Sequence, residues 1–395
     1  MTANVRKKVA LLIETSNAYA RGLLSGVIAY EQRHGSWSLF VPEQERGGAP
    51  PRWLAQWKGD GIIARIETDA IAEAIRKTQL PLVDLSAARY LPNAPWVETN
   101  DEAVANRGAD YLIARGFRNL GFCGDPSFNW SKWRLEAFRR AVAKHGMECH
   151  LYQSIPRYDA QYSWNRESKR LTKWIEQLPK PVGIMACYDI KAQQLLETCR
   201  EMDIAVPEQV AVIGVDNDRL ICELCSPPLT SISLNSFRAG LEAAALLDRM
   251  MEGEAVSTQP ILIDPLEIHE RQSTDTFAVD DPQIAEALRY IREHLCANIR
   301  VQDIVQHVDL SRRQLEHRFR KLVGHTPHQE IQRRRIDRVK RLLMQTDLSV
   351  AEIAQLAGYE HAEYLCVVFQ RETGETMSEF RRRQGADSSE PTRAR

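Results

Sequence analysis

The chain has 395 residues, of which 44% are hydrophobic, and its formal net charge at pH 7 is −1. This length is enough for two or three domains with separate cores, and the near-neutral charge by itself predicts no class of partner. No apolar run reaches the roughly 18 residues of a membrane-spanning helix, so the sequence predicts no membrane segment.

The N-terminal sequence MTANVRKKVALLIE is basic and then apolar, but the apolar run is short and lacks a cleavage pattern. It is more typical of a first β-strand than of a signal peptide. The eight cysteines are scattered, and Cys222 and Cys225 form one CxxC pair without a second pair or a nearby histidine. We therefore expect reduced, packed thiols in a cytoplasmic protein, without a metal or cofactor.

The segment up to residue 270 predicts a two-lobed α/β domain with parallel sheets flanked by helices. Continuous apolar runs between helical stretches indicate strands that are covered on both faces. The expected strands are 9–14, 38–42, 61–66, 81–86, 119–124, 182–188, 210–216 and 261–268. The expected helices are 23–33, 103–115, 133–145, 167–177, 190–201 and 236–252. Strands occur on both sides of a midpoint near residue 150, which favours two lobes over one large sheet.

The pattern changes near residue 282 to helix alone. Residues 271–281 are polar and predict a linker, residues 282–384 predict an all-α domain, and residues 385–395 predict a disordered tail. Within 311–341 there are 11 Lys and Arg against 3 Asp and Glu. This concentration of positive charge indicates a nucleic-acid contact, and a solvated basic helix face is the alternative.

One short sequence motif occurs twice in this region. FRKLVGHTP begins at Phe319, and FQRETGETM begins at Phe369. Each follows a short helix, a tight turn at Asp309 or Gly358, and a second helix with apolar positions turned inward. Two helices joined by such a turn are a helix-turn-helix, whose second helix enters the major groove of DNA. A purely structural helical hairpin is the alternative, but two copies joined by the basic stretch 331–346 favour DNA binding.

Residues 284–384 resemble the DNA-binding domain of the AraC/XylS family. The resemblance is carried by RVKRLLMQTDLSVAEIAQLAGY (338–359), followed by a Phe, a Gly-polar-Thr and a terminal FRR. The second copy departs from the family pattern at Glu360-His361, at Leu365-Cys366, and at Met377 in place of proline. These departures do not change the implied fold. They do affect whether the second motif can contact DNA bases specifically.

Recognition-helix positions give the expected DNA contacts. Base edges should face Ser311, Arg313, Glu316 and His317 of the first copy. Phosphates should meet Arg312, Arg318, Arg320 and Lys321. The equivalents in the second copy are Ala362, Glu363, Cys366 and Val367, a nearly uncharged face for which we expect weaker, more apolar readout.

The first 275 residues resemble the sugar-binding regulatory domain of the LacI family, which is itself similar to periplasmic binding proteins. The resemblance lies in RGFRNLGFCGDP (115–126), WRLEAF (133–138), residues 181–218, PLTSI (228–232) and ERQST (270–274). This sensor followed by a double helix-turn-helix resembles the xylose operon regulators. The resemblance implies a homodimer that binds operator DNA and a pentose such as D-xylose. It also implies activation of sugar-use genes through RNA polymerase.

Polar residues follow the predicted strands where open α/β sheets bind ligands. The candidate ligand-binding residues are Asn17, Tyr19, Arg21, Asp84, Arg134, Trp164, Asp189 and Asp216. A pentose needs carboxylate and guanidinium partners for its hydroxyls and an aromatic plate for its ring. Arg134, Trp164 and Asp216 also match ligand positions of the resembled family.

Each candidate has a structural alternative. Asp189 has the position of a cap for the helix that follows it, and Asp216 has the chemistry of a structural carboxylate. Asn17 and Tyr19 can shape the first turn, and Trp164 can be a core residue. Asp84 fits a ligand contact and a structural role equally well.

Two other classes of protein fit less well. The sequence contains no GxSxG, P-loop, HExxH or strand-associated GxGxxG, so we expect no catalytic residues and no enzyme. A periplasmic transport component is disfavoured by the helix-turn-helix domain. The same architecture sensing another sugar or metabolite, or acting as a repressor, remains the alternative to a xylose-responsive activator.

Overall fold

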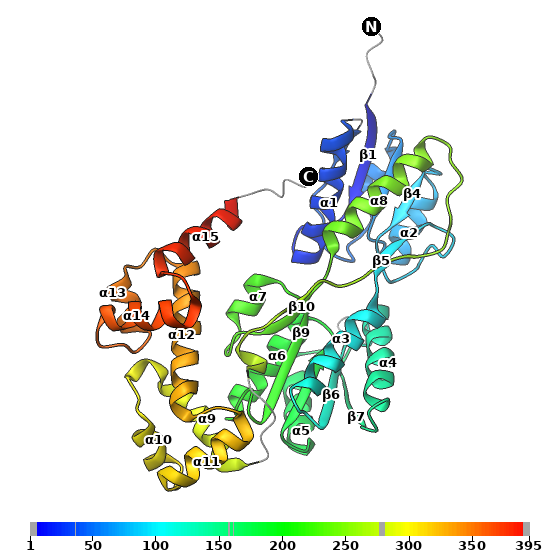
Figure 1. Cartoon of the computed structure of the whole chain (residues 1–395). Helices are drawn as coiled ribbons and strands as arrows, with labels where there is room; N and C mark the ends of the chain where they lie inside the picture. Colours follow the sequence, from blue (N-terminus) through cyan, green and yellow to red (C-terminus); the bar gives the residue numbers. More distant parts are fainter. Residues whose placement is uncertain (1–5, 36, 157–158, 161, 276–280, 390–395) are drawn as a thin grey trace. The chain divides into compact units, whose positions relative to one another are not determined.

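The computed structural model describes residues 6–35, 37–156, 159–160, 162–275 and 281–389. The chain forms two compact units, Met1–Ala278 and Val279–Arg395 (Figure 1). The first unit is α/β and the second contains helices alone in its described part, which confirms the predicted fold class. No helix in the described ranges is long and apolar enough to cross a membrane.

The first lobe of the α/β unit is built on a four-stranded parallel sheet. Its strand order is β2 (Trp37–Phe40), β1 (Lys7–Leu12), β3 (Gly61–Ala64) and β4 (Leu82–Asp84). One face packs against α1 (Ala18–His34) and α8 (Ser236–Met251). The other face packs against α2 (Asp69–Arg76) and the 3₁₀ helix η1 (Arg52–Gln56). Because β1 and β3 are covered on both sides, they are almost entirely apolar.

The second lobe contains a six-stranded sheet. Its order is β12 (Ile268–His269), β10 (Thr230–Ser233), β9 (Val210–Asp216), β8 (Val182–Ala186), β6 (Asn119–Gly124) and β7 (Cys149–Gln153), with only β12 antiparallel. Helices α3 (Asp101–Ala114) and α4 (Asn129–Ala143) cover one face. Helices α5 (Trp164–Gln177) and α6 (Asp189–Glu201) cover the other, with the short α7 (Arg219–Leu224) beside α6.

The chain passes between the lobes three times. Strand β5 (Val97–Thr99) pairs with β11 (Ile261–Ile263), and β5 leads directly into α3 of the second lobe. The chain returns from β10 to α8, and it leaves the first lobe again between β11 and β12. Strands β5, β7 and β10 were not among the predicted strands because they are short and carry polar residues. The predicted strand 261–268 is divided into β11 and the start of β12.

The first unit extends beyond the predicted start of the linker at residue 271. Residues Gln272–Thr274 form a 3₁₀ turn in which Ser273 and Thr274 are fully buried. The Thr274 hydroxyl lies 2.8 Å from the Tyr111 hydroxyl and 2.7 Å from that of Thr230. These contacts hold the segment against the second lobe. The rest of the predicted linker, 276–280, lies outside the described residues.

The second unit contains two helix-turn-helix motifs. The first is α10 (Val301–His307) and α11 (Arg312–Val323), preceded by α9 (Pro282–His294) and the 3₁₀ turn η3 (Leu295–Ala297). The second is α13 (Val350–Leu356) and α14 (Ala362–Thr373), reached through α12 (Pro327–Gln345). Asp309 and Gly358 take the left-handed conformation in the two turns, with φ of 49° and 75°, as the sequence predicts.

The repeated motif that begins at Phe319 and at Phe369 forms the end of each recognition helix. Gly324 and Gly374 terminate α11 and α14 with φ of 88° and 80°. Two residues later, Thr326 and Thr376 accept hydrogen bonds from the first turns of α12 and α15. The repeated motif therefore supplies a glycine that terminates one helix and a threonine that caps the next. Helix α15 (Met377–Ser389) extends into the predicted tail, whose residues 390–395 lie outside the described ranges.

Candidate functional site

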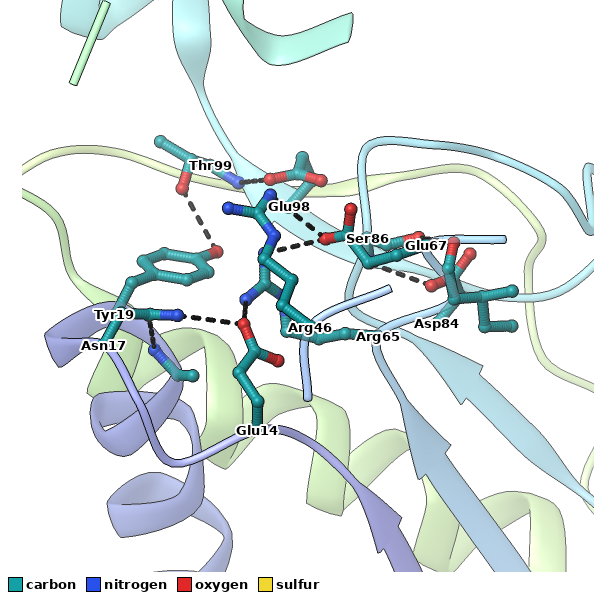
Figure 2. A network of polar contacts seen from close by, with 12 residues as sticks. Glu14, Asn17, Tyr19, Arg46, Arg65, Glu67, Asp84, Ser86, Glu98 and Thr99 are labelled. Carbon is teal, nitrogen blue, oxygen red and sulfur yellow. Dashed lines mark hydrogen bonds and ion pairs between the residues drawn. The ribbon is translucent and has the colours of Figure 1, made fainter. Parts of the chain in front are cut away.

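Charged side chains gather where β1 and β3 of the first lobe end. Figure 2 shows Arg65 between two carboxylates, Glu14 and Glu67. Glu67 Oε1 accepts hydrogen bonds from Arg65 Nη2 at 2.9 Å and from Arg46 Nη2 at 3.2 Å. Glu14 and Arg65 are buried, so each charge depends on the other for compensation.

Asn17 and Tyr19 lie beside this network and contribute to its shape. Asn17 caps α1 through the Ala20 amide and donates to Glu14 Oε1 at 2.9 Å. The Tyr19 hydroxyl lies 3.3 Å from Thr99 Oγ1, and the Arg65 guanidinium stands 5.5 Å from the Tyr19 ring centroid.

Arg21 lies apart from these groups. It is exposed on α1, and it donates to the Thr15 carbonyl at 3.0 Å.

Three buried carboxylates stand where the chain passes from the first lobe to the second. Asp84 ends β4, Glu98 lies in β5, and Asp101 begins α3. One oxygen of Asp84 accepts from the Ser86 amide at 2.8 Å, and one oxygen of Glu98 accepts from the Thr99 amide at 3.0 Å. Within the described part of the chain, the second oxygen of each of the three carboxylates has no hydrogen-bond partner.

Burial changes the acidity of these carboxyls. It raises the pKa of Asp84 to about 7. Burial, followed by the charge of Asp101, raises the pKa of Glu98 to about 8. The cause is the loss of hydration of the charged form. Such groups are favoured sites for polar ligands, because a ligand supplies the hydrogen bonds that water no longer gives.

Arg89 and Trp96 add donors to the same region. The Arg89 guanidinium lies 3.6 Å from the Trp96 ring centroid, and the charge of Arg89 acts on Asp84. Arg89 Nη1 and Trp96 Nε1 are buried and without hydrogen-bond partners among the described residues. The region therefore offers unused donors as well as unused acceptors.

Arg134 is a buried cation of the second lobe, next to Asp101. Its Nε lies 2.6 Å from Asp101 Oδ1, and its Nη1 donates to the Cys187 carbonyl at 2.6 Å. Its guanidinium also stands 4.9 Å from the ring centroid of Trp130. The aromatic plate beside Arg134 is therefore Trp130, which the sequence analysis did not single out. Trp164 is 36% exposed at the first position of α5.

Asp216 and Asp189 have different surroundings. Burial raises the pKa of Asp216 to about 6, while Arg134, Arg46 and Arg65 oppose that change. Asp189 is buried, and its carboxylate accepts from the Ser231 hydroxyl at 2.6 Å and the Asp218 amide at 2.8 Å. Both of its oxygens therefore have partners within the second lobe, and its side chain does not cap α6.

The two lobes touch through residues that follow strand ends. The Arg46 guanidinium of the first lobe lies 4.6 Å from the Phe128 ring centroid of the second. Asn129 Nδ2 donates to the Ala87 carbonyl at 3.0 Å, and the Ala18 amide donates to Asp218 at 3.3 Å. The carboxylates and guanidinium groups described above therefore lie near the place where the two lobes meet.

Only part of this set of residues was predicted from the sequence. Asn17, Tyr19, Asp84, Arg134 and Asp216 were among the candidates, whereas Glu14, Arg46, Arg65, Arg89, Glu98 and Asp101 were not. Arg65 lies near the end of the predicted strand 61–66 and Glu67 follows it, so polar residues at the end of this strand were a usable signal. Glu98 and Asp101 had no such signal, since β5 was not predicted.

Helix α11 presents most of the predicted DNA contacts of the first motif on its surface. Arg313, His317, Arg320 and Lys321 are exposed, and Ser311 caps the helix through the Gln314 amide. Arg312 and Glu316 form an ion pair at 2.9 Å.

Arg318 differs from the other basic residues of α11. It donates to Asp281 at 3.3 Å and to Gln283 at 2.9 Å, so it joins α11 to the start of α9.

Two of the eleven basic residues of the segment 311–341, Arg334 and Arg335, are buried. Glu330 is buried and contacts Arg333, Arg334 and His325. Arg335 is only 6% exposed, with its guanidinium 5.4 Å from the Tyr359 ring centroid. The charge count of this segment therefore overstates the surface that is available to phosphates.

Helix α14 presents the predicted apolar face of the second motif. Glu363, Cys366 and Val367 are exposed, and Ala362 is half-buried at the first position of the helix. Tyr364 is also exposed on this helix, a residue that the prediction did not include.

Cysteine and metal chemistry find little support. Cys222 and Cys225 are free and buried, and Cys222 Sγ lies 3.5 Å from Asp189 Oδ2. Burial raises the pKa of Cys225 to about 12, which disfavours the reactive thiolate. No cluster of metal-ligating side chains occurs among the residues described.

Three segments of the chain match known protein families. Residues 8–102 match the XylR N-terminal domain, residues 109–274 match a periplasmic binding protein-like domain, and residues 304–383 match a helix-turn-helix domain. The first segment covers most of the first lobe, the second covers most of the second lobe together with α8 and β11, and the third lies in the helical unit.

Two curated proteins are similar over nearly the whole chain. The xylose operon regulatory protein of Escherichia coli strain K12 is 32% identical over 384 residues, which cover 95% of this chain and 97% of that protein. The protein of the same name from Haemophilus influenzae is 33% identical over 382 residues, with coverages of 95% and 98%.

Two solved structures are also similar to this chain. The structure of the xylose-binding transcription activator xylR has a TM-score of 0.82 at 31% identity, with coverages of 95% and 98%. A periplasmic binding protein/LacI transcriptional regulator from Alkaliphilus metalliredigens, complexed with D-xylulofuranose, covers 68% of this chain with a TM-score of 0.54. At 20% identity, the second match supports the fold alone.

Proposed function

Because the chain belongs to the family of the xylose operon regulatory protein, and is thus a sugar-sensing, DNA-binding transcription regulator and not an enzyme, we propose that its effector is D-xylose or a related pentose. The sugar binds in the cleft between the two lobes of the first unit. The same architecture responding to another sugar or metabolite, or acting as a repressor, is the alternative.

The observation that carries this proposal is the set of unused buried oxygens on Asp84, Glu98 and Asp101. A buried acceptor without a partner costs about 1–3 kcal/mol, and more when it is charged. Pentose hydroxyls donate and accept hydrogen bonds, so one ring can pair with the carboxylates and with the open donors of Arg89 and Trp96. An apolar effector would leave these groups unpaired.

We assign the predicted ligand-binding residues three kinds of role. Asp84, Arg134 and Asp216 contact the sugar, with Trp130 and Trp96 as aromatic neighbours. Asn17 and Tyr19 position the first-lobe network. Asp189 supports the second lobe, and Arg21 and Trp164 do not contact the sugar.

Sugar binding favours the arrangement in which both walls contact the ligand. The equilibrium shifts by the difference in affinity between the two arrangements. We propose that the change reaches the helical unit through the segment after Thr274. It alters how two subunits of a homodimer place their α11 and α14 helices on direct-repeat half-sites of operator DNA. Activation through RNA polymerase, in the cytoplasm, is the expected output.

A calorimetric titration of the full chain with D-xylose, L-arabinose, D-ribose and D-glucose tests the effector. We expect one pentose to bind, and Asp84→Asn or Asp216→Asn to weaken it at least about tenfold, since charged hydrogen bonds contribute about 1.5–3 kcal/mol. The control Arg21→Gln changes an exposed residue of α1 and should bind normally. A sugar that binds all three variants equally would exclude the cleft, and no binding by any pentose would exclude the pentose assignment.

A further inference from the structure

A cavity in the second lobe is lined by none of the cleft residues described above. Its volume is about 580 Å³, and it is formed where β6 and β7 end and α5 begins. None of its lining residues belongs to the network of Arg134, Asp101 and Asp216. The proposed sugar site therefore does not account for it.

The cavity wall is strongly basic. Arg166, Lys169 and Arg170 line it from the first two turns of α5, at spacings that place them on one helix face. The other lining residues in the described part of the chain are uncharged: Pro126, Gln153, Ser154, Ile155 and Pro156. The amino-terminal end of α5 adds its partial positive charge to the same wall.

The carboxylate nearest in sequence does not neutralise this wall. Glu167 is fully buried, and it accepts from Lys191 at 3.2 Å and from the Ile155 amide at 3.1 Å. Arg170 donates to the Gln153 carbonyl at 3.1 Å. Lys169 has no hydrogen bond or ion pair with any described residue, so its charge is available to a ligand.

A buried hydroxyl points to a specific ligand. Ser154 follows β7 and is 3% exposed, yet its Oγ has no hydrogen-bond partner among the described residues. An unpaired buried hydroxyl is unfavourable for the empty protein. It becomes useful if a ligand in the cavity accepts its proton.

We propose that this cavity binds a phosphate monoester of a small metabolite. The phosphate dianion is held by Lys169 and Arg166 and accepts a hydrogen bond from Ser154. Its carbon portion lies against the rings of Pro126 and Pro156. The protein thereby has a second ligand, which joins the sugar signal to the supply of phosphorylated metabolites.

Calorimetric titration of the full chain at constant ionic strength tests this site, with inorganic phosphate and glycerol 3-phosphate as probes and glycerol as the neutral control. We expect both phosphates to bind at one site per chain and glycerol not to bind. Lys169→Gln and Arg166→Gln should each weaken binding about tenfold, the loss expected for one charge-assisted hydrogen bond.

Three further variants make the result specific. Lys173→Gln removes an exposed lysine from the same helix outside the cavity, and it should not change phosphate affinity. Ser154→Ala should weaken binding severalfold without lowering the melting temperature, because the hydroxyl has no partner to lose. Asp216→Asn should keep phosphate binding even where sugar binding is lost, which separates this site from the cleft. Absence of phosphate binding, or equal losses in Lys169→Gln and Lys173→Gln, would overturn the proposal.

Discussion

Arg134 Nε lies 2.6 Å from Oδ1 of Asp101, and both side chains are almost completely buried. The pair joins α4 to the first residue of α3, where the chain enters the second lobe from β5. Asp101 keeps its second oxygen free, and Arg134 is within range of the charge on Asp216. The same ion pair therefore stabilises the lobe and forms part of the cleft surface.

Arg134→Ala should lower the free energy of unfolding by about 3–5 kcal/mol, because it leaves the Asp101 carboxylate buried without its cation. Denaturant unfolding of the full chain, followed by tryptophan fluorescence, measures the loss. The double variant Arg134→Ala/Asp101→Ala should recover part of it, since no unpaired charge remains. Equal stabilities of the single variant and the wild type would show that the pair is not structural.

Asp84 should make the stability of the sugar-free protein depend on pH. Its pKa is about 7 in the fold and near 3.8 when free, so the folded chain binds an additional proton between these values. The cost of the buried carboxylate is therefore present at pH 8 and is lost as the pH falls through 7. The free energy of unfolding should rise on acidification, by up to about 1.4 kcal/mol per pH unit.

The matched control for this titration is Asp84→Asn, which keeps the size of the side chain and cannot ionise. The difference in unfolding free energy between wild type and variant should shift in favour of the wild type from pH 8 to pH 5. A difference that stays constant would show that Asp84 does not titrate in this range.

The fold was largely predictable from the sequence because its strongest signals are local. Buried strands such as 210–216 are continuous apolar runs, and the glycines that end the recognition helices, the threonine caps and the buried Phe319 and Phe369 are repeated in the two motifs. The edge strand Cys149–Gln153 was not predicted because its sequence, CHLYQ, has neither an apolar run nor a strict alternation of apolar and polar residues.

The residues of the cleft were less predictable because they come from segments on both sides of the point where the chain passes from one lobe to the other. Glu98 and Asp101 flank a three-residue strand, and their meeting with Arg134 depends on packing between α3 and α4. The basic count of 311–341 indicated a nucleic-acid contact, but it overstated the exposed basic surface for a different reason. A charge count does not distinguish Arg335, which is buried, from Lys321, which is exposed.

The two turn positions of the helix-turn-helix motifs should respond in opposite directions to substitution. Asp309→Gly relieves a non-glycine residue at a φ of 49° and should stabilise the chain by up to about 1 kcal/mol. Gly358→Ala should destabilise it by at least about 2 kcal/mol, since a Cβ there would approach the Leu295 carbonyl oxygen at 2.5 Å. Thermal unfolding of both variants checks the contrast, and a shared sign would contradict it.

Salt dependence should separate the basic residues of α11. Arg320→Ala and Lys321→Ala remove exposed charges, so each should reduce the slope of log affinity against log salt by about 0.9 on operator DNA. The earlier expectation that Arg318 contacts phosphate is tested alongside them. Its bonds to Asp281 and Gln283 lead us to expect lower stability and little change in slope for Arg318→Ala. A slope change equal to that of Arg320→Ala would restore Arg318 as a phosphate contact.

The two recognition helices should contribute unequally to sequence reading. Arg313→Ala on α11 should reduce discrimination against single-base operator changes by about 1–3 kcal/mol, since arginine reads guanine with two hydrogen bonds. On α14, Val367 is 65% exposed and has only an apolar contact to offer, such as a thymine methyl, so Val367→Ala should change affinity less than about threefold.

The matched gain-of-charge variant is Val367→Arg, measured by fluorescence anisotropy on an operator selected from random DNA and its single-base variants. It should change the preferred base under the second motif while leaving positions read by α11 unchanged. An unchanged preference across all positions would show that α14 does not face bases, and the second motif would then serve only to position the first.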